Sequence, residues 1–207
     1  MVESTDKLPR KEREREAHRR EILAAAETVF GEKGYHNTTV KDIAEAAEFS
    51  VGTLYNLFEN KEDIYVKLIE QLIDDFMQGF DLEVLAANDP GHALSRLVEL
   101  RLSFIDNHAA FVRAFFAAVP GSRLDPSGAL PPSCREIYDR YLDELCKLFH
   151  RTSESTLFGR HEPVYQAVAF EGILNGFGAF WAREKPTEPL QTRVNKVKAF
   201  LGLEDLE

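Results

Sequence analysis

The 207-residue sequence contains only two cysteines and one tryptophan, and it has no excess of positive charge. Two cysteines cannot form the disulfide framework of a small secreted protein, so we expect a reducing, cytoplasmic environment. No segment approaches the roughly 18 consecutive apolar residues of a membrane-spanning helix, and the charged N-terminal segment does not resemble a secretory signal. These absences favour a cytoplasmic globular protein without a membrane partner.

The negative charge is unevenly distributed. The formal net charge is −10, which excludes a histone-like positive coat but not site-specific DNA binding. Residues 62–207 hold 15 Lys and Arg against 23 Asp and Glu, whereas residues 1–61 hold ten against twelve. In Met1–Arg20 the basic residues outnumber the acidic ones, seven to five. We therefore expect any attraction for a polyanion at the N-terminal end.

Helical spacing of apolar residues covers almost the whole sequence, and no useful length alternates as a β-strand does. The expected fold class is all-α. Side chains that can cap a helix N-terminus precede several of these segments. They are Thr39 with Asp42, Ser50, Asn60 with Asp63, and Ser133 with Glu136.

The pattern predicts two domains. Residues 1–60 would form an N-terminal arm and a three-helix, helix-turn-helix DNA-binding head. Residues 61–207 would form a larger helical domain for ligand binding and dimerisation, with 61–80 as the linking helix. The Pro/Gly/Ser-rich segment 120–133 is expected to be a surface loop. By spacing alone, the head could equally be a plain helical bundle.

A specific set of residues extends over roughly positions 20 to 70 and favours the first alternative. It comprises Gly34-Tyr35, Thr38-Thr39, Ile43-Ala44, Ala47, Ser50, Gly52-Thr53-Leu54-Tyr55, Phe58 and Lys61-Glu62. This set resembles the DNA-binding region of the TetR family of bacterial transcriptional regulators. The resemblance implies a homodimer that binds a double-stranded DNA operator with its heads and an unknown small-molecule effector in its bodies.

The resemblance also implies which residues contact DNA. Hydroxyl groups of Thr39 and Tyr55 and the charge of Lys61 would hold phosphates, and the exposed face of the recognition helix would read bases. Tyr55 could instead serve packing alone, and Thr39 could be only a helix cap. The DNA-binding set is Thr39, Lys41, Ser50, Val51, Gly52, Thr53, Tyr55, Asn56 and Lys61, with diffuse attraction or minor-groove contact from Arg10, Lys11, Arg13 and Arg15.

Two residues depart from the family pattern. Glu48 occupies a turn position that is commonly glycine and is expected to need a positive φ. Val51 stands where the family often has lysine or arginine. The second departure puts base contacts borrowed from the family in doubt.

The C-terminal body is rich in aromatic residues, which usually fill a core but can also line a pocket. We expect an apolar or aromatic ligand, oriented by a few polar groups. The candidate ligand-binding residues are Phe76, Phe80, Arg101, Phe104, Asn107, His108, Phe111, Phe115, Tyr138 and Tyr141.

Two C-terminal helices are candidates for a twofold interface that forms a four-helix bundle. The alternative is that both are internal core helices. The predicted interface residues share one helical face in each segment: Ala167, Phe170, Glu171, Leu174, Phe177, Gly178, Trp181, Val194, Val197, Phe200 and Leu201.

An enzyme is the main competing class. Cys146 and His150 have a spacing that suits metal ligation, but no third ligand lies nearby in the sequence. We find no phosphate-binding glycine loop and no nucleophile with its base, so we expect no catalytic residues, no metal and no cofactor. A helical adaptor is a third class. The predicted function is a ligand-released homodimeric repressor, with an activator or corepressor-dependent regulator as the alternative.

Overall fold

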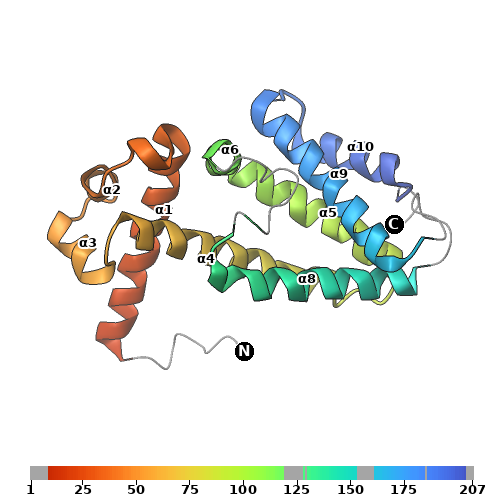
Figure 1. Cartoon of the computed structure of the whole chain (residues 1–207), viewed down its shortest axis with the longest axis horizontal. Helices are drawn as coiled ribbons and strands as arrows, with labels where there is room; N and C mark the ends of the chain where they lie inside the picture. Colours follow the sequence, from red (N-terminus) through yellow and green to blue (C-terminus); the bar gives the residue numbers. More distant parts are fainter. Residues whose placement is uncertain (1–8, 119–127, 129, 153–160, 185, 204–207) are drawn as a thin grey trace.

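The computed structural model describes residues 9–118, 128, 130–152, 161–184 and 186–203. These residues are helical and contain no β-strand, as the spacing predicted. Figure 1 shows a head that contains α1, α2 and α3 at one end and a larger helical body at the other, with α4 running from the head into the body. Most of the predicted loop 120–133 lies outside the described residues.

The helices are labelled in chain order. They are α1 (Arg10–Asn37), α2 (Val40–Ala46), α3 (Val51–Leu57), α4 (Lys61–Gly79), the π-helical turn η2 (Phe80–Val84), α5 (Pro90–Asn107), α6 (Ala109–Ala118), α8 (Pro132–Arg151), α9 (Pro163–Glu184) and α10 (Leu190–Leu201).

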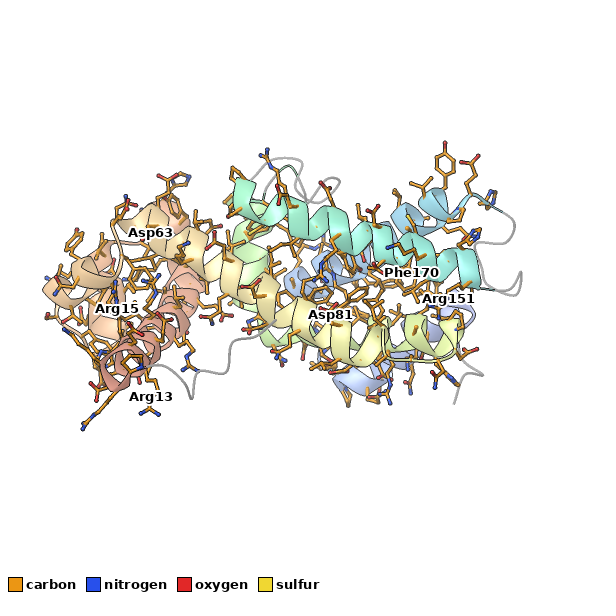
Figure 2. All side chains as sticks on the ribbon, turned by 90° about the horizontal axis from the view of Figure 1, so that it is seen from below. Arg13, Arg15, Asp63, Asp81, Arg151 and Phe170 are labelled. Atoms are coloured by element: carbon orange, nitrogen blue, oxygen red, sulfur yellow. The ribbon has the colours of Figure 1, made fainter. Side chains whose placement is uncertain are left out.

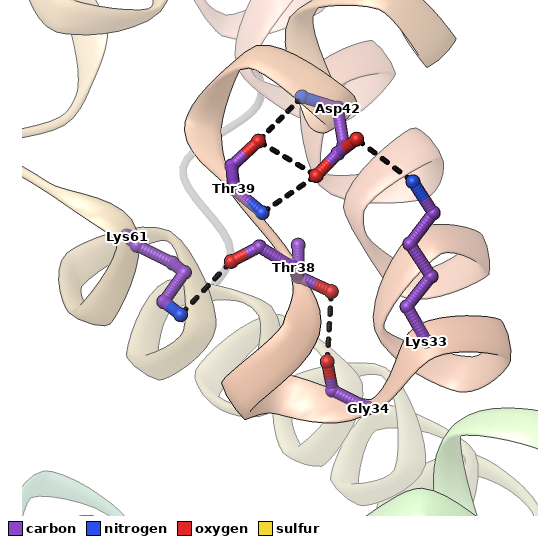
Figure 3. Close-up of polar contacts among 6 residues, drawn as sticks. All are labelled: Lys33, Gly34, Thr38, Thr39, Asp42 and Lys61. Atoms are coloured by element: carbon purple, nitrogen blue, oxygen red, sulfur yellow. Dashed lines mark hydrogen bonds and ion pairs between the residues drawn. The ribbon is translucent and has the colours of Figure 1, made fainter.

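Capping side chains determine where the helices of the head begin. The Thr39 hydroxyl accepts from the Asp42 backbone N–H at 3.1 Å, and the Thr39 N–H donates to the Asp42 carboxylate at 2.8 Å, which completes a capping box (Figure 3). Ser50 caps α3 and Asn60 caps α4 through the same type of hydrogen bond. Three of the predicted helix starts are thereby confirmed.

The turn between α2 and α3 has the expected unusual backbone. Glu48 has φ 59°, the left-handed region in which a side chain costs about 1–2 kcal/mol. The turn is closed by the Phe49 N–H, which donates to the Ala44 carbonyl at 2.9 Å. The helix-turn-helix therefore keeps its geometry without glycine, at some cost in stability.

Replacing Glu48 with glycine should consequently stabilise the fold. The strain at positive φ disappears, and the larger backbone entropy of glycine in the unfolded chain offsets part of the gain. We expect the free energy of unfolding to rise by about 0.5 kcal/mol, measured by urea denaturation. Glu48→Ala is the matched control, because it removes the charge but keeps the Cβ atom; an equal gain in both variants would contradict the backbone explanation.

The buried side chains form two clusters that meet along α4. The head cluster joins α1, α2 and α3 to the first half of α4, including Ile64 and Leu68, and extends to Phe111 of α6 and Cys134 of α8. The body cluster takes Phe76 and later residues of α4. The head core therefore continues beyond the predicted boundary at 60/61 into the linking helix.

The start of α8 differs from the prediction. Ser133 does not cap this helix, which already begins at Pro132. A proline at the first helical position has its φ set for a helix and needs no partner for a missing N–H. The Ser133 hydroxyl instead donates to Glu70 Oε1 of α4 at 2.6 Å, and thus ties α8 to the linking helix.

The predicted interface face of α9 and α10 is mostly wrong, because it points into the same protomer. Eight of the predicted residues are buried within a single chain: Ala167, Phe170, Glu171, Leu174, Gly178, Val194, Val197 and Leu201. Figure 2 shows Phe170 among the helices of the body. Phe177 and Trp181 are half-buried, and only Phe200 is exposed. Because α9 is apolar on both faces, helical spacing alone could not identify the outer one.

Candidate DNA-binding surface and internal cavity

One face of the recognition helix α3 packs against the rest of the head, and the opposite face is exposed. Leu54 is fully buried, and the Arg19 guanidinium of α1 donates to the Leu57 carbonyl at 2.8 Å at the C-terminal end of α3. The residues predicted to contact DNA are exposed on α2, α3 and their caps, except for the half-buried Thr53 and Lys61: Thr39, Lys41, Ser50, Val51, Gly52, Tyr55 and Asn56. The head thus brings most of the predicted set to its surface.

Tyr55 and Lys61 have different environments. Tyr55 is 56% exposed, so its hydroxyl is available to a ligand at the surface. The Lys61 ammonium donates to the Thr38 carbonyl at 2.9 Å (Figure 3). It also donates to the Tyr35 carbonyl at 2.8 Å and lies 4.4 Å from the centre of the Tyr35 ring. Lys61 therefore joins the end of α1 to the start of α4, a structural role that the sequence did not indicate.

The N-terminal cations lie on a helix rather than in an extended arm. α1 begins at Arg10, so Arg10, Lys11, Arg13 and Arg15 all belong to its first turns. Figure 2 shows Arg13 at the outer edge of the head. Arg10 is paired with Glu14 at 2.7 Å, which reduces its effective charge. These residues can add diffuse attraction, whereas an arm entering a minor groove would involve residues 1–8, outside the described part of the chain.

Asp42 makes the stability of the head depend on pH. A hydrogen bond from Lys33 and two from Thr39 hold the pKa of Asp42 far below its usual range. A depressed folded-state pKa means that the stabilisation is present above the unfolded pKa, near about 3.9, and is lost as the pH falls further.

Asp42→Asn should therefore destabilise the protein at neutral pH, and the difference from the wild type should shrink below about pH 4. Urea unfolding between about pH 3 and pH 7 measures this difference. Asp139→Asn, at an exposed position of α8, is the control and should show no such trend. A pH-independent difference for Asp42→Asn would contradict the carboxylate's role.

A cavity of about 140 Å³ lies where the two buried clusters meet. Its wall is almost entirely apolar, and it includes residues from α4, α5, α6, α8 and α9. The lining consists of Ile69, Leu72, Ile73, Phe76, Met77, Arg101, Phe104, Ile105, Phe111, Val112, Phe115, Phe116, Leu130, Ile137, Tyr138, Tyr141 and Asn175.

Seven of the ten predicted ligand-binding residues line this cavity: Phe76, Arg101, Phe104, Phe111, Phe115, Tyr138 and Tyr141. The other three do not. Phe80 is fully buried against Tyr141, Asn107 is exposed at the end of α5, and His108 Nδ1 lies 2.6 Å from Glu27 Oε1 of α1. The aromatic residues of the sequence identified most of the cavity wall. They could not show that the polar side chains of 107 and 108 point away from it.

The polar end of the cavity includes residues that the sequence analysis missed or misassigned. Arg101 Nη2 donates to Asn175 Oδ1 at 2.8 Å and lies 3.7 Å from Glu171 Oε2. The Tyr141 hydroxyl donates to Glu171 Oε1, and burial followed by the neighbouring carboxylate raises the pKa of Tyr141 well above its usual value. Glu171 is the only charged residue in the sequence 163–182, a feature that could have singled it out but does not identify its partner.

Cys146 and His150 gain no third metal ligand in the described part of the chain, where no three His, Cys, Asp or Glu side chains are grouped as metal ligands. Burial raises the pKa of both cysteines, Cys134 and Cys146, which disfavours a reactive thiolate. The helices that the structure describes also include none with the length and apolarity needed to cross a membrane.

Comparison with known proteins gives the same assignment for the head. Residues 22–68 match the family model described as "Bacterial regulatory proteins, tetR family". The HTH-type transcriptional activator FasR of Mycolicibacterium smegmatis is 30% identical over 111 residues, covering 54% of this chain and 48% of that protein. The HTH-type transcriptional repressor KstR2 of Rhodococcus jostii is 36% identical over 93 residues, covering 44% and 46%. The chain thus matches about half the length of these relatives, which are named as regulators and not as enzymes.

The similarity of the fold extends over most of the chain. The transcriptional regulator FadR from Bacillus subtilis, whose structure was solved in complex with stearoyl-CoA, superposes with a TM-score of 0.68 at 19% identity. The superposition covers 90% of this chain and 97% of FadR. The helix-turn-helix head, residues 22–68, thus matches the tetR family of bacterial regulatory proteins, and the fold of the whole chain is similar to that of the regulator FadR.

Proposed function

We propose that this protein is a transcriptional regulator that binds an inverted-repeat operator as a homodimer and leaves the DNA when a small apolar molecule occupies its cavity. The observation that carries the proposal is the position of the cavity along α4. Its wall contains Ile69 and Leu72 of the head cluster as well as Phe76 of the body cluster. A ligand there contacts the helix that joins the two parts.

The heads would hold DNA with few cations. Hydroxyl groups, such as that of Tyr55, and helix N-terminal N–H groups can bind phosphates, and Asn56 on the exposed face of α3 suits adenine. Glu45 and Glu48 are also exposed on the head and weaken nonspecific attraction. We therefore expect a shallow dependence of operator affinity on salt concentration.

A second route couples the body to the head through α6. An added Cβ atom at Gly31 of α1 would lie 2.8 Å from the Ala110 Cβ, so these helices are in close contact. The Glu27–His108 pair links the same α1 surface to the corner between α5 and α6. Since α6 supplies Phe111 and Phe115 to the cavity wall, a ligand that displaces α6 also shifts the head.

The proposed dimer uses the outer face of α9 with Phe200 of α10. This face exposes large apolar side chains, Val164, Tyr165, Val168 and Phe180, on both sides of Gly172 and Gly176. A Cβ atom added at either glycine would meet nothing within 4 Å in its own chain. Two copies can thus approach closely along a symmetric, apolar strip, as an isologous interface requires.

Selection of DNA from a random pool tests the function. The purified dimer should enrich an inverted repeat, and apolar compounds that enter the cavity should release it. Enrichment of no sequence, at low salt and with the folded dimer verified, would contradict DNA binding. We favour repression over activation because effector binding at α4 would disturb the heads. A reporter gene placed behind the selected operator measures whether the protein represses or activates transcription.

A further inference from the structure

We propose that the cavity is specific for a small neutral molecule, with an apolar ring and a hydrogen-bond-accepting head, and that Glu171 excludes anionic ligands by neutralising Arg101. This inference deepens the proposed function, because it takes the cavity as the effector site. It concerns the chemical class of the ligand, which can be measured without DNA.

The size of the cavity limits the size of the ligand. An engineered protein cavity of about 150 Å³ lined by Leu, Ile and Phe accepts benzene. The present volume of about 140 Å³, with an almost wholly apolar wall, therefore accommodates one ring with a short substituent. Phe76 and Phe104, whose ring centroids are 5.6 Å apart, provide aromatic contacts for such a ring.

Arg101 favours a ligand whose head accepts a hydrogen bond. It is the only charged residue among the described residues of the cavity wall. Its guanidinium lies over the Phe76 ring at 5.4 Å and donates to Asn175, but its Nε is buried and has no hydrogen-bond partner. A buried N–H without an acceptor has a free-energy cost. A ligand oxygen beside Arg101 would remove that cost.

Glu171 makes the binding of an anionic ligand unfavourable. Its side chain is 5% exposed, and its Oε2, 3.7 Å from Arg101 Nη2, has no hydrogen-bond partner. Glu171 does not line the cavity itself, so it balances the charge of Arg101 from a position outside the cavity wall. The pair has no net charge, and a carboxylate entering the cavity would bring an uncompensated negative charge into an apolar site. A neutral head avoids this penalty.

Tyr141 maintains this arrangement. Its raised pKa keeps the phenol protonated, so that it continues to donate to Glu171 Oε1 and holds the carboxylate beside Arg101. Tyr138 also lines the cavity, and its ring centroid lies 6.2 Å from that of Tyr141. The site therefore presents the N–H donor of Arg101 without an uncompensated positive charge.

Three benzyl compounds test the charge rule by calorimetry on the full-length protein at neutral pH. 2-Phenylacetamide and phenylacetate have the same shape and differ in head-group charge, whereas 2-phenylethylamine carries a positive charge and lacks the carbonyl acceptor. We expect the amide to bind about tenfold more tightly than either ion, or better. The tightest binding by phenylacetate, or binding of none of the three at millimolar concentration, would overturn the proposal.

Glu171→Gln provides the decisive variant. Glutamine keeps the shape and can still accept from Tyr141, but it leaves Arg101 uncompensated. The affinity for phenylacetate relative to the amide should rise about tenfold or more, whereas the matched control Glu99→Gln, on α5 beside Lys198 and Arg96, should leave the ratio unchanged. An unchanged ratio in a folded Glu171→Gln protein would also overturn the proposal.

Operator release separates the two proposals. If the amide binds but does not affect DNA, the ligand class stands and the effector response fails. If an anionic ligand binds in the cavity and releases DNA, the regulator stands and the ligand class fails.

Discussion

Gly172→Arg is expected to convert the dimer into a monomer and to reduce operator affinity by about 100-fold or more. The arginine would stand on the outer face of α9, between exposed apolar side chains such as Val168 and Phe180. In the proposed dimer each copy would bury this charge in an apolar contact. Operator binding falls because two linked heads bind DNA far more tightly than one.

The same substitution should leave the isolated protomer folded. An added Cβ atom at position 172 has no neighbour within 4 Å, and arginine favours a helix over glycine by about 0.8 kcal/mol. Light scattering gives the molar mass, circular dichroism the helix content and a fluorescence titration the operator affinity. Gln78→Arg, at an exposed position of α4, adds the same charge away from α9. A dimer that persists in Gly172→Arg would mean that the interface lies elsewhere.

This prediction depends on a feature that the sequence could not provide. Helical spacing placed residues such as Phe170 and Leu174 on one face of α9, and they do share a face. The opposite face is also apolar, with Val168 and Phe180 exposed. A helix that is apolar all round carries no signal for which side meets its own protomer. Only the packing of α9 against α5 and α8 decides that, and it is non-local.

The head was more predictable because local interactions define it. The capping side chains of Thr39, Ser50 and Asn60 act within three residues of their own position. The positive φ of Glu48 also follows from the tight turn around it. In contrast, the links of Glu171 to Arg101 and of His108 to Glu27 join residues 70 and 81 positions apart, and no local pattern indicates them.

Separate replacement of Tyr55 and Lys61 by alanine is expected to give two different phenotypes. Tyr55→Ala should weaken operator binding about tenfold or more, because each head loses a hydrogen bond to a charged phosphate, a contact of about 1.5–3 kcal/mol. Its side chain is 56% exposed, so the free energy of unfolding should hardly change. Tyr55→Phe isolates the hydroxyl, and operator affinity equal to that of the wild type would show that Tyr55 serves packing alone.

Lys61→Ala should lower both stability and operator affinity. It removes the ammonium that holds the carbonyls of Tyr35 and Thr38 at the end of α1, and we expect a loss of about 1–2 kcal/mol in unfolding free energy. The position of Thr39, the next residue, should shift with that loss. Urea unfolding measured beside the operator titration separates the two effects. Unchanged stability with lost DNA binding would instead assign the Lys61 charge to a phosphate.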